Sequence, residues 1–443
     1  MRATFSLWLL LRRRGASSSD PQRLTTVLAV VAFAVATALL LVVLGGVGAF
    51  VERAVGADET SDAPLYVSLA WMAAGLLVVP LSALGGAAAR LAVARRDARL
   101  AALRLAGATT GQVATLTVLD AASQALLGAL TGILGYLALI PVFAHVRFQG
   151  RAFGLGELWT GVPVLLAAVT GVVLVALFSS VVSLRRVAIT PLGVANRVHP
   201  KGLSWSRVVL ALAIAAVFGA ITASGDAATL VIGAVLVLGF FTLNLVGPFT
   251  IWLIGRVTAA RARKVPTLLA GRRMVDDPKT AWRSVGGVAL ATFIAGMTSI
   301  GVLMADADSS PENRQFLTDI ATGGYLTLAI AGLLAAVSTG VMQAGQVIGQ
   351  RSQYRALSLA GTDLAVLNAA RMKETVIPLV VSVGTTALFS LLFMVPLFRF
   401  LGLSPWDSAH VPLQYAASVL AAGALVLAGS AASRSVVRDV VAG

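Results

Sequence analysis

The chain has 443 residues, of which 58% are hydrophobic and only 12% are charged, and its formal net charge is +15. A soluble domain of this size has about twice that share of charged residues, so the composition excludes an ordinary water-exposed surface and predicts a membrane protein. The absence of cysteine excludes disulfides and thiol chemistry, and the three histidines are too far apart in sequence to form a metal-binding motif.

Ten apolar segments follow one another along the chain, each near the length of about 20 residues that a transmembrane helix needs. They are residues 24–49, 65–89, 114–141, 160–183, 207–223, 228–254, 285–304, 320–345, 375–398 and 413–431. The first is too long for a signal peptide and is expected to be retained. The turn at Gly225-Asp226 joins the fifth and sixth segments as a tight hairpin or a re-entrant element. The predicted fold class is therefore an all-α, polytopic membrane protein.

Lys and Arg are distributed unequally between the two sides of this arrangement. With the N-terminus in the cytoplasm, 29 of the 34 basic residues fall in cytoplasmic segments and 5 in external ones. This bias predicts a multi-pass protein of the cell membrane with both termini in the cytoplasm. The basic excess lies beside the anionic lipid headgroups, so membrane lipid is expected as a partner and nucleic acid is not. The external loops are too short to fold as separate domains.

A short sequence recurs at an offset of 254 residues. Residues 102–107 read Ala-Leu-Arg-Leu-Ala-Gly and residues 356–361 read Ala-Leu-Ser-Leu-Ala-Gly, and the same offset places Asp120 opposite Glu374. Each copy has a predicted membrane-spanning helix before and after it. We therefore expect two parallel four-helix repeats related by a pseudo-twofold axis. The predicted boundaries are 1–200 for the first repeat with its N-terminal cytoplasmic segment, 201–260 for a linking helix pair, and 261–443 for the second repeat.

The cytoplasmic segment 92–107 has the composition of a charged surface helix, because Ala, Leu and Arg favour helix formation. Gly107 is a natural helix end, and Thr109 or Thr110 is expected to cap the next helix. In the second copy Gly361 is expected to end the corresponding helix.

Such a helix suits mechanical coupling, because a soluble partner can hold its side chains and move the attached membrane helices. The alternative is a surface helix that only anchors to lipid headgroups. Two copies at matching positions favour the partner. The residues expected to contact it are Arg96, Asp97, Arg99, Leu103, Arg104 and Gly107 in the first copy, and Arg351, Gln353, Arg355, Leu357 and Gly361 in the second.

These segments carry a family resemblance. Residues 96–113, with Asp120 beyond them, resemble the segment after the second helix in FtsX-like (MacB-type) ABC transporter permeases. Residues 353–361, followed by Glu374, are similar to a second occurrence of it, and residues 185–192 resemble the cytoplasmic tail after the fourth helix. The resemblance implies a ten-helix permease whose surface helices contact ATPase subunits. Many members have a large extracellular domain, and the short external loops here leave no room for one.

The chain contains no G-x-x-x-x-G-K-[ST] phosphate-binding loop, so ATP hydrolysis is expected in a separate protein. No cofactor, metal or catalytic residue is expected in this chain. The expected partner is a cytoplasmic ABC ATPase, in two copies per permease chain, which binds ATP and Mg²⁺. The predicted function is a membrane permease that couples this hydrolysis to export of a hydrophobic or amphiphilic drug, peptide or lipid.

Two alternatives remain open at this point. An ion-coupled secondary transporter would need ionisable residues within the membrane. Asp120 is the only acidic residue inside the ten segments, and Glu374 borders the ninth; we interpret both as structural, with Glu374 paired to a nearby base such as Arg371 or Lys373. The other alternative is a non-transporting signal transducer driven by an ATPase partner, for which the short external loops offer little surface.

Overall fold

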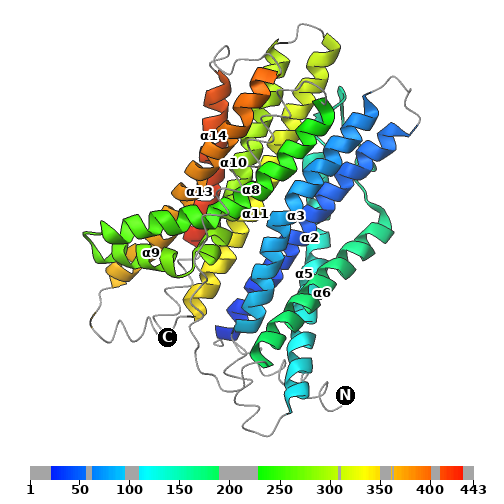
Figure 1. Cartoon of the computed structure of the whole chain (residues 1–443). Helices are drawn as coiled ribbons and strands as arrows, with labels where there is room; N and C mark the ends of the chain where they lie inside the picture. The colour runs from blue at the N-terminus through cyan, green and yellow to red at the C-terminus, as the bar shows by residue number, and fades with distance from the viewer. Residues whose placement is uncertain are drawn as a thin grey trace.

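The computed structural model describes residues 21–55, 62–94, 109–188, 228–307, 311–349, 361, 364–400 and 410–432. Within these ranges the chain is helical except for one small antiparallel hairpin (Figure 1). The elements are α2 (Pro21–Ala54), α3 (Ala63–Ala94), α5 (Thr110–Phe143), β1 (Arg147–Phe148), β2 (Arg151–Ala152), α6 (Gly161–Ala188), α8 (Ala228–Ala260), α9 (Val265–Asp276), α10 (Pro278–Ala307), α11 (Pro311–Gly349), α13 (Leu364–Phe400) and α14 (His410–Ala432). The predicted all-α polytopic class is confirmed.

Eight of the described helices are long and apolar enough to cross a membrane, namely α2, α3, α5, α6, α8, α11, α13 and α14. The predicted segment 285–304 lies within α10, in which residues 288–296 are all buried. A helix buried on every side belongs to the interior of a bundle. The predicted segment 207–223 lies outside the described residues. The short helix α9 was not predicted from the sequence.

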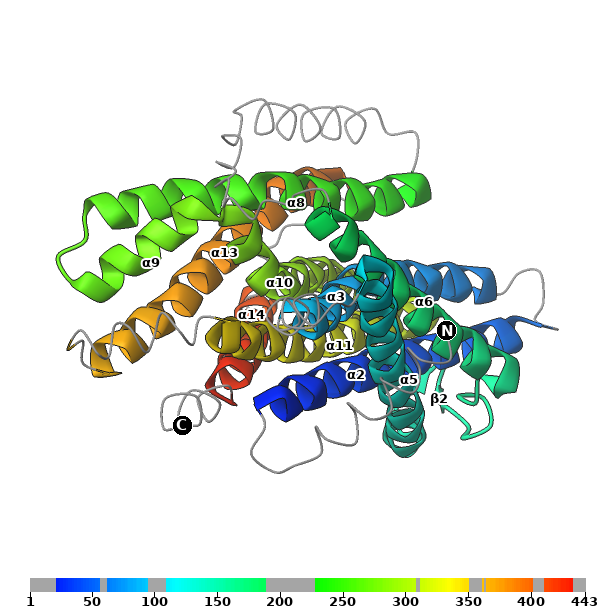
Figure 2. The ribbon, with the colours of Figure 1, turned by 90° about the horizontal axis from the view of Figure 1, so that it is seen from below.

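The membrane helices form two groups, α2, α3, α5 and α6 in the first and α10, α11, α13 and α14 in the second, and the first three helices of each group pack alike. The fourth helices differ, because α6 packs mainly on α5 whereas α14 packs mainly on α11 and α10. In the first group α2 packs against α3 and α5, and in the second α10 packs against α11 and α13. Both α2 and α10 begin at a proline that follows an aspartate, Pro21 and Pro278, where proline's missing N–H is not needed. This similarity is what a duplication predicts, although the domain boundaries stay a prediction. Helices α8 and α9 pack beside the second group against α13 (Figure 2).

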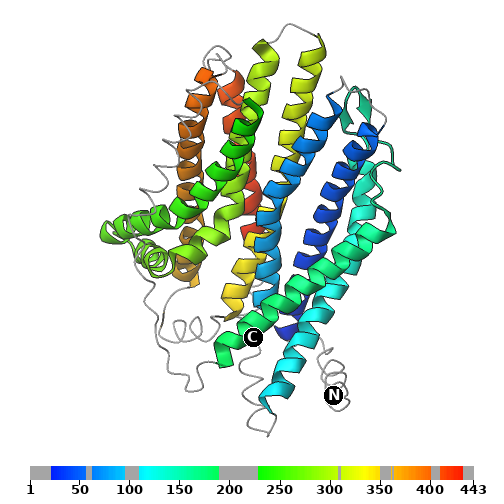
Figure 3. The same ribbon diagram turned by 45° about the vertical axis from the view of Figure 1, so that its right-hand side comes forward.

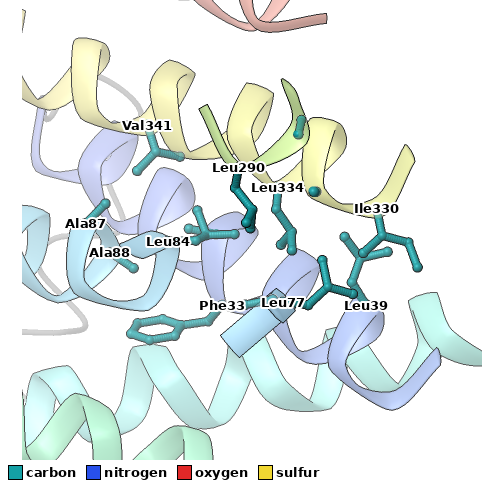
Figure 4. Close-up of a cluster of buried hydrophobic side chains, with 14 of the residues drawn as sticks. Phe33, Leu39, Leu77, Leu84, Ala87, Ala88, Leu290, Ile330, Leu334 and Val341 are labelled. Atoms are coloured by element: carbon teal, nitrogen blue, oxygen red, sulfur yellow. The ribbon is translucent and has the colours of Figure 1, made fainter. Parts of the chain in front are cut away.

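The two groups meet where α3 packs against α11. A continuous cluster of buried side chains fills this interface (Figure 4). Its members include Phe33 from α2, Leu77, Leu84 and Ala88 from α3, Leu290 from α10, and Ile330, Leu334 and Val341 from α11. The second helix of each group therefore forms the seam of the molecule.

Glycines allow α5 to lie close against α2. A Cβ atom at Gly128 would lie 2.4 Å from Phe33 Cβ, and one at Gly132 would lie 2.6 Å from the carbonyl oxygen of Ala34. Small residues at four-residue spacing are typical of closely packed membrane helices, because they let the backbones approach. This contact holds the first group together.

The bundle has two distinct ends (Figures 1 and 3). The β1–β2 hairpin lies at one end, together with the start of α6. We call this end the hairpin face. Helix α9 lies toward the opposite end, where α2 and α10 begin, and we call that end the basic face.

Candidate functional site

A cavity of about 300 Å³ lies between the two groups near the hairpin face. Its walls come from α2, α3, α10, α11 and the segment that contains the hairpin. Most of the lining is apolar, as represented by Val43, Met72, Met297, Ile330 and Phe148. A largely apolar hollow with few polar groups is the usual form of a small-molecule site. The cavity is therefore the candidate binding site of this chain.

Asp319 is the one acidic residue in the cavity lining, and only 8% of it is exposed. Its Oδ2 atom accepts a hydrogen bond of 2.7 Å from the hydroxyl of Tyr66 in α3. The same atom accepts another of 2.7 Å from the backbone N–H of Gln149 in the hairpin. Asp319 thus joins α11, α3 and the hairpin. Asp319 was not predicted as a site residue, because it directly precedes the predicted segment 320–345 and was counted with the external loop.

The hairpin turns through two residues with left-handed backbone conformation. Gln149 has φ of 56° and Gly150 has φ of 75°, which matches the two-residue turns that suit the twist of a β-hairpin. This geometry places Phe148 in the cavity wall, 4% exposed. A glycine as the second turn residue is the sequence signal that indicates such a hairpin.

Arg53, at the end of α2, fastens the hairpin from the other side. Its side chain is 2% exposed and lies 2.7 Å from a carboxylate oxygen of Glu157. It also donates to the carbonyl oxygens of Phe148 at 3.0 Å and Ala152 at 3.2 Å, and its guanidinium lies 4.6 Å from the ring centre of Phe153. A buried guanidinium is stable only when its charge and its donors are satisfied in this way. The hairpin is therefore fixed to both α2 and α11.

The Glu157 carboxylate is held in its charged form. Partial burial raises its pKa, but hydrogen bonds from Arg53 and from the Gly154 N–H lower it, as do the charges of Arg53 and Arg151. The lowering effects prevail, so the pKa of Glu157 lies below its ordinary value. The ion pair with Arg53 therefore persists to a lower pH than the ordinary pKa of a glutamate would allow.

A second ionic contact lies on the basic face. Arg273 of α9 donates to a carboxylate oxygen of Glu374 in α13 at 2.6 Å. Lys373, one of the partners suggested for Glu374 from the sequence, instead donates to the hydroxyl of Thr267 in α9. Adjacent residues of a helix point in different directions, which separates Lys373 from Glu374. Two contacts thus tie α9 to the start of α13.

Other predicted residues are placed as follows. Asp120 lies half-buried on α5, and its carbonyl oxygen accepts from the hydroxyl of Ser123. Thr109 caps α5 as expected, and its side chain and that of Gln112 bond reciprocally to each other's backbone N–H. Gly361 has φ of 82°, the left-handed conformation expected where a helix ends.

The remaining coupling residues lie outside the described part of the chain, so their role stays a prediction. They are Arg96, Asp97, Arg99, Leu103, Arg104 and Gly107 of the first copy, and Arg351, Gln353, Arg355 and Leu357 of the second. In the described part, no group of histidine, aspartate and glutamate residues could hold a metal ion.

The helices and the shared apolar cavity define a multi-pass membrane protein with two packed groups of helices. Residues 71–192 match the family model of the FtsX-like permease C-terminal domain. The match confirms the FtsX-like resemblance expected from the sequence over these residues, and it supports a membrane subunit of the ABC transporter permease type. The match runs from α3 through α6 and includes the segment 92–107. Neither a curated protein nor a solved structure matches the chain.

Proposed function

We propose that the chain is the permease of an ABC exporter for hydrophobic or amphiphilic molecules. Two cytoplasmic ATPase subunits, which bind ATP and Mg²⁺, would hold the segments 92–107 and 346–361 and move the two helical groups against each other. The observation that carries this proposal is the FtsX-like match over residues 71–192, which contains the first of these segments.

The connections of the two segments suit this role. The first segment follows α3 and the second follows α11 along the chain. These are the two helices that pack against each other at the seam. A force applied to both segments therefore acts on the seam, and the cavity lies along the same two helices. This arrangement supports a mechanism in which ATPase closure changes the shape of the cavity.

The distribution of basic residues supports a cytoplasmic basic face. Exposed cations gather on and next to α9, at Arg261, Arg263, Lys264, Arg272 and Arg273. The same helix exposes apolar side chains, including Val265 and Leu269. A short helix with both features lies at the membrane surface among anionic headgroups. The hairpin face would then be external, and the cavity would lie toward the external side.

The apolar lining of the cavity supports an apolar or amphiphilic substrate. Its walls would leave the polar groups of a sugar or nucleotide without partners, which costs binding energy. Export is the proposed direction, because a cavity near the external face is positioned to release its ligand outward.

The test is affinity purification of the tagged chain from its native membranes, with identification of the proteins that accompany it. We expect a P-loop ATPase to co-purify, and to be lost when Arg99 and Arg104, or Arg351 and Arg355, are replaced by glutamate. The control replaces Arg147 and Arg314 by glutamate; both are exposed cations, one in the hairpin and one in the first turn of α11, and the complex should stay intact. Recovery of the chain without an ATPase, or equal loss in the control, would overturn the proposal.

A further inference from the structure

We propose that the cavity binds amphiphilic cations, with Asp319 facing the cationic group. This inference names the substrate class of the proposed export site. It rests on the proposed function for transport, whereas binding itself needs only this chain.

The charge of Asp319 is not neutralised by an ion pair in the described part of the chain. Its two hydrogen bonds come from neutral donors, Tyr66 and the Gln149 N–H, and both reach the same oxygen atom. Within the described part of the chain, no Lys, Arg or His side chain forms an ion pair with it. A carboxylate in apolar surroundings is costly unless an opposite charge compensates it. A cationic ligand in the cavity would supply that charge.

The hydroxyl groups of the cavity lining donate to acceptors within the protein. Thr298 donates its hydrogen to the carbonyl oxygen of Ile294 at 2.9 Å, and Thr327 donates to that of Gly323 at 2.7 Å. The Tyr66 hydroxyl donates to Asp319. All three hydroxyl hydrogens are thus used within the protein, and what remains on these oxygens is acceptor capacity. The side-chain polar atoms of the lining, as they are bonded here, therefore suit a cation better than an anion.

A group of aromatic rings lies in the same walls. Phe50 packs edge-on against Phe148 and Phe153, with ring centres 5.3 Å and 5.6 Å apart, and stacks on Tyr66 at 5.8 Å. All four rings line the cavity, and because Arg53 already lies over the Phe153 ring, the rings of Phe50, Tyr66 and Phe148 are the ones that a ligand cation would meet. Aromatic faces attract cations and repel anions, and the effect is strongest away from water. Rings and carboxylate thus select the same sign of charge.

The experiment compares two probes of similar size and shape and opposite charge, tetraphenylphosphonium and tetraphenylborate. Each is equilibrated with the purified chain in phosphatidylcholine nanodiscs, and uptake by protein-free nanodiscs is subtracted. The test variant is Asp319→Asn, which keeps an acceptor for Tyr66 and Gln149 and removes only the charge. The control is Asp62→Asn, which removes the same charge from an exposed position near the same face.

We expect the native chain to bind the cation and not the anion. Asp319→Asn should weaken cation binding by about tenfold or more, as loss of a desolvated charge pair does, and Asp62→Asn should leave it unchanged. Equal binding of both probes by the native chain would overturn the proposal, even if the Asp319 variant does not fold. Native-like cation binding by a folded Asp319→Asn protein would overturn it as well. Because no ATPase is present, failure here is distinct from failure of the exporter proposal.

Discussion

The hydroxyl of Tyr66 in α3 donates a 2.7 Å hydrogen bond to Asp319 of α11, across 253 residues of sequence. The bond joins the two helical groups at the hairpin face. The segments proposed to contact the ATPase leave the same two helices at their other ends. Any sliding or separation of α3 against α11 near the hairpin face must therefore break this bond. We infer that it keeps the seam closed in the described state.

Replacing Tyr66 by phenylalanine should destabilise the protein, because a buried carboxylate loses one of its two donors. We expect a loss of about 1–3 kcal/mol in the free energy of unfolding, seen as a lower melting temperature in detergent. The matched control is Tyr325→Phe, since Tyr325 bonds Gln414 across an exposed contact. Equal stability of the two variants would contradict the proposed role of Tyr66.

Replacing Arg53 by alanine should release the hairpin. The change removes the Arg53 donor from the carbonyls of Phe148 and Ala152 and leaves the Glu157 carboxylate with only the Gly154 N–H and the exposed Arg151. The cost is at most about 3–5 kcal/mol, the value for a broken buried pair. Hydrogen exchange of residues 147–152 should become faster.

The control for this prediction is Arg151→Ala. Arg151 also approaches Glu157, at 3.5 Å, but its side chain is 60% exposed. Exposed ion pairs contribute about 0–1 kcal/mol, so the rate of hydrogen exchange in residues 147–152 should change little in this variant. Protection of the hairpin that does not depend on Arg53 would show that Asp319 alone holds it.

The Glu157 ion pair predicts a specific dependence on pH. Because the pKa of Glu157 is lower in the folded protein, its contribution to stability is fully present above the ordinary glutamate value of 4.5. The contribution is lost as the pH falls through the lowered pKa. Between about pH 6 and about pH 3, the melting temperature should fall more for the native chain than for Glu157→Gln. If the melting temperatures of the two proteins fell equally with pH, the stabilising role of the Glu157 ion pair would be contradicted.

The contact between Arg273 and Glu374 links α9 to α13, which begins just after the second proposed coupling segment. Arg273→Glu should place two carboxylates in contact and reduce the ATPase activity of the assembled complex. The double variant Arg273→Glu, Glu374→Arg should recover most of it, because the charges again attract. Since the Arg273 side chain is 43% exposed, we expect a change in stability of no more than about 1 kcal/mol. Failure of the double variant to recover activity would show that the ion pair itself is not needed.

Local sequence signals predicted much of the fold. The apolar segments predicted the helices, because their length and composition are dictated by the membrane. Thr109, with Gln112 three residues later, caps α5, and Gly361 adopts the left-handed conformation expected at a helix end. In each case the interaction lies within a few residues of the chain, so local sequence contains the information.

The candidate site depends on contacts between distant residues. Asp319 became part of a cavity only because α11 packs against α3 and brings Tyr66 to it. The sequence around Arg53 did not indicate that its side chain would bind Glu157, which lies 104 residues later. Arg273 was not predicted as a partner of Glu374, because it lies on α9, a helix of 12 residues whose pattern is too short to stand out. Proline at its start, Pro266, is the signal that could have indicated it.

The central claim is that this chain is the membrane part of an ATP-driven complex, and native mass spectrometry tests it most directly. The tagged chain would be isolated from its native membranes in a mild detergent with a non-hydrolysable ATP analogue and Mg²⁺. The proposal predicts a complex of one permease chain with two copies of a P-loop ATPase. A chain recovered alone, or only with further copies of itself, would contradict the claim and favour an ion-coupled carrier.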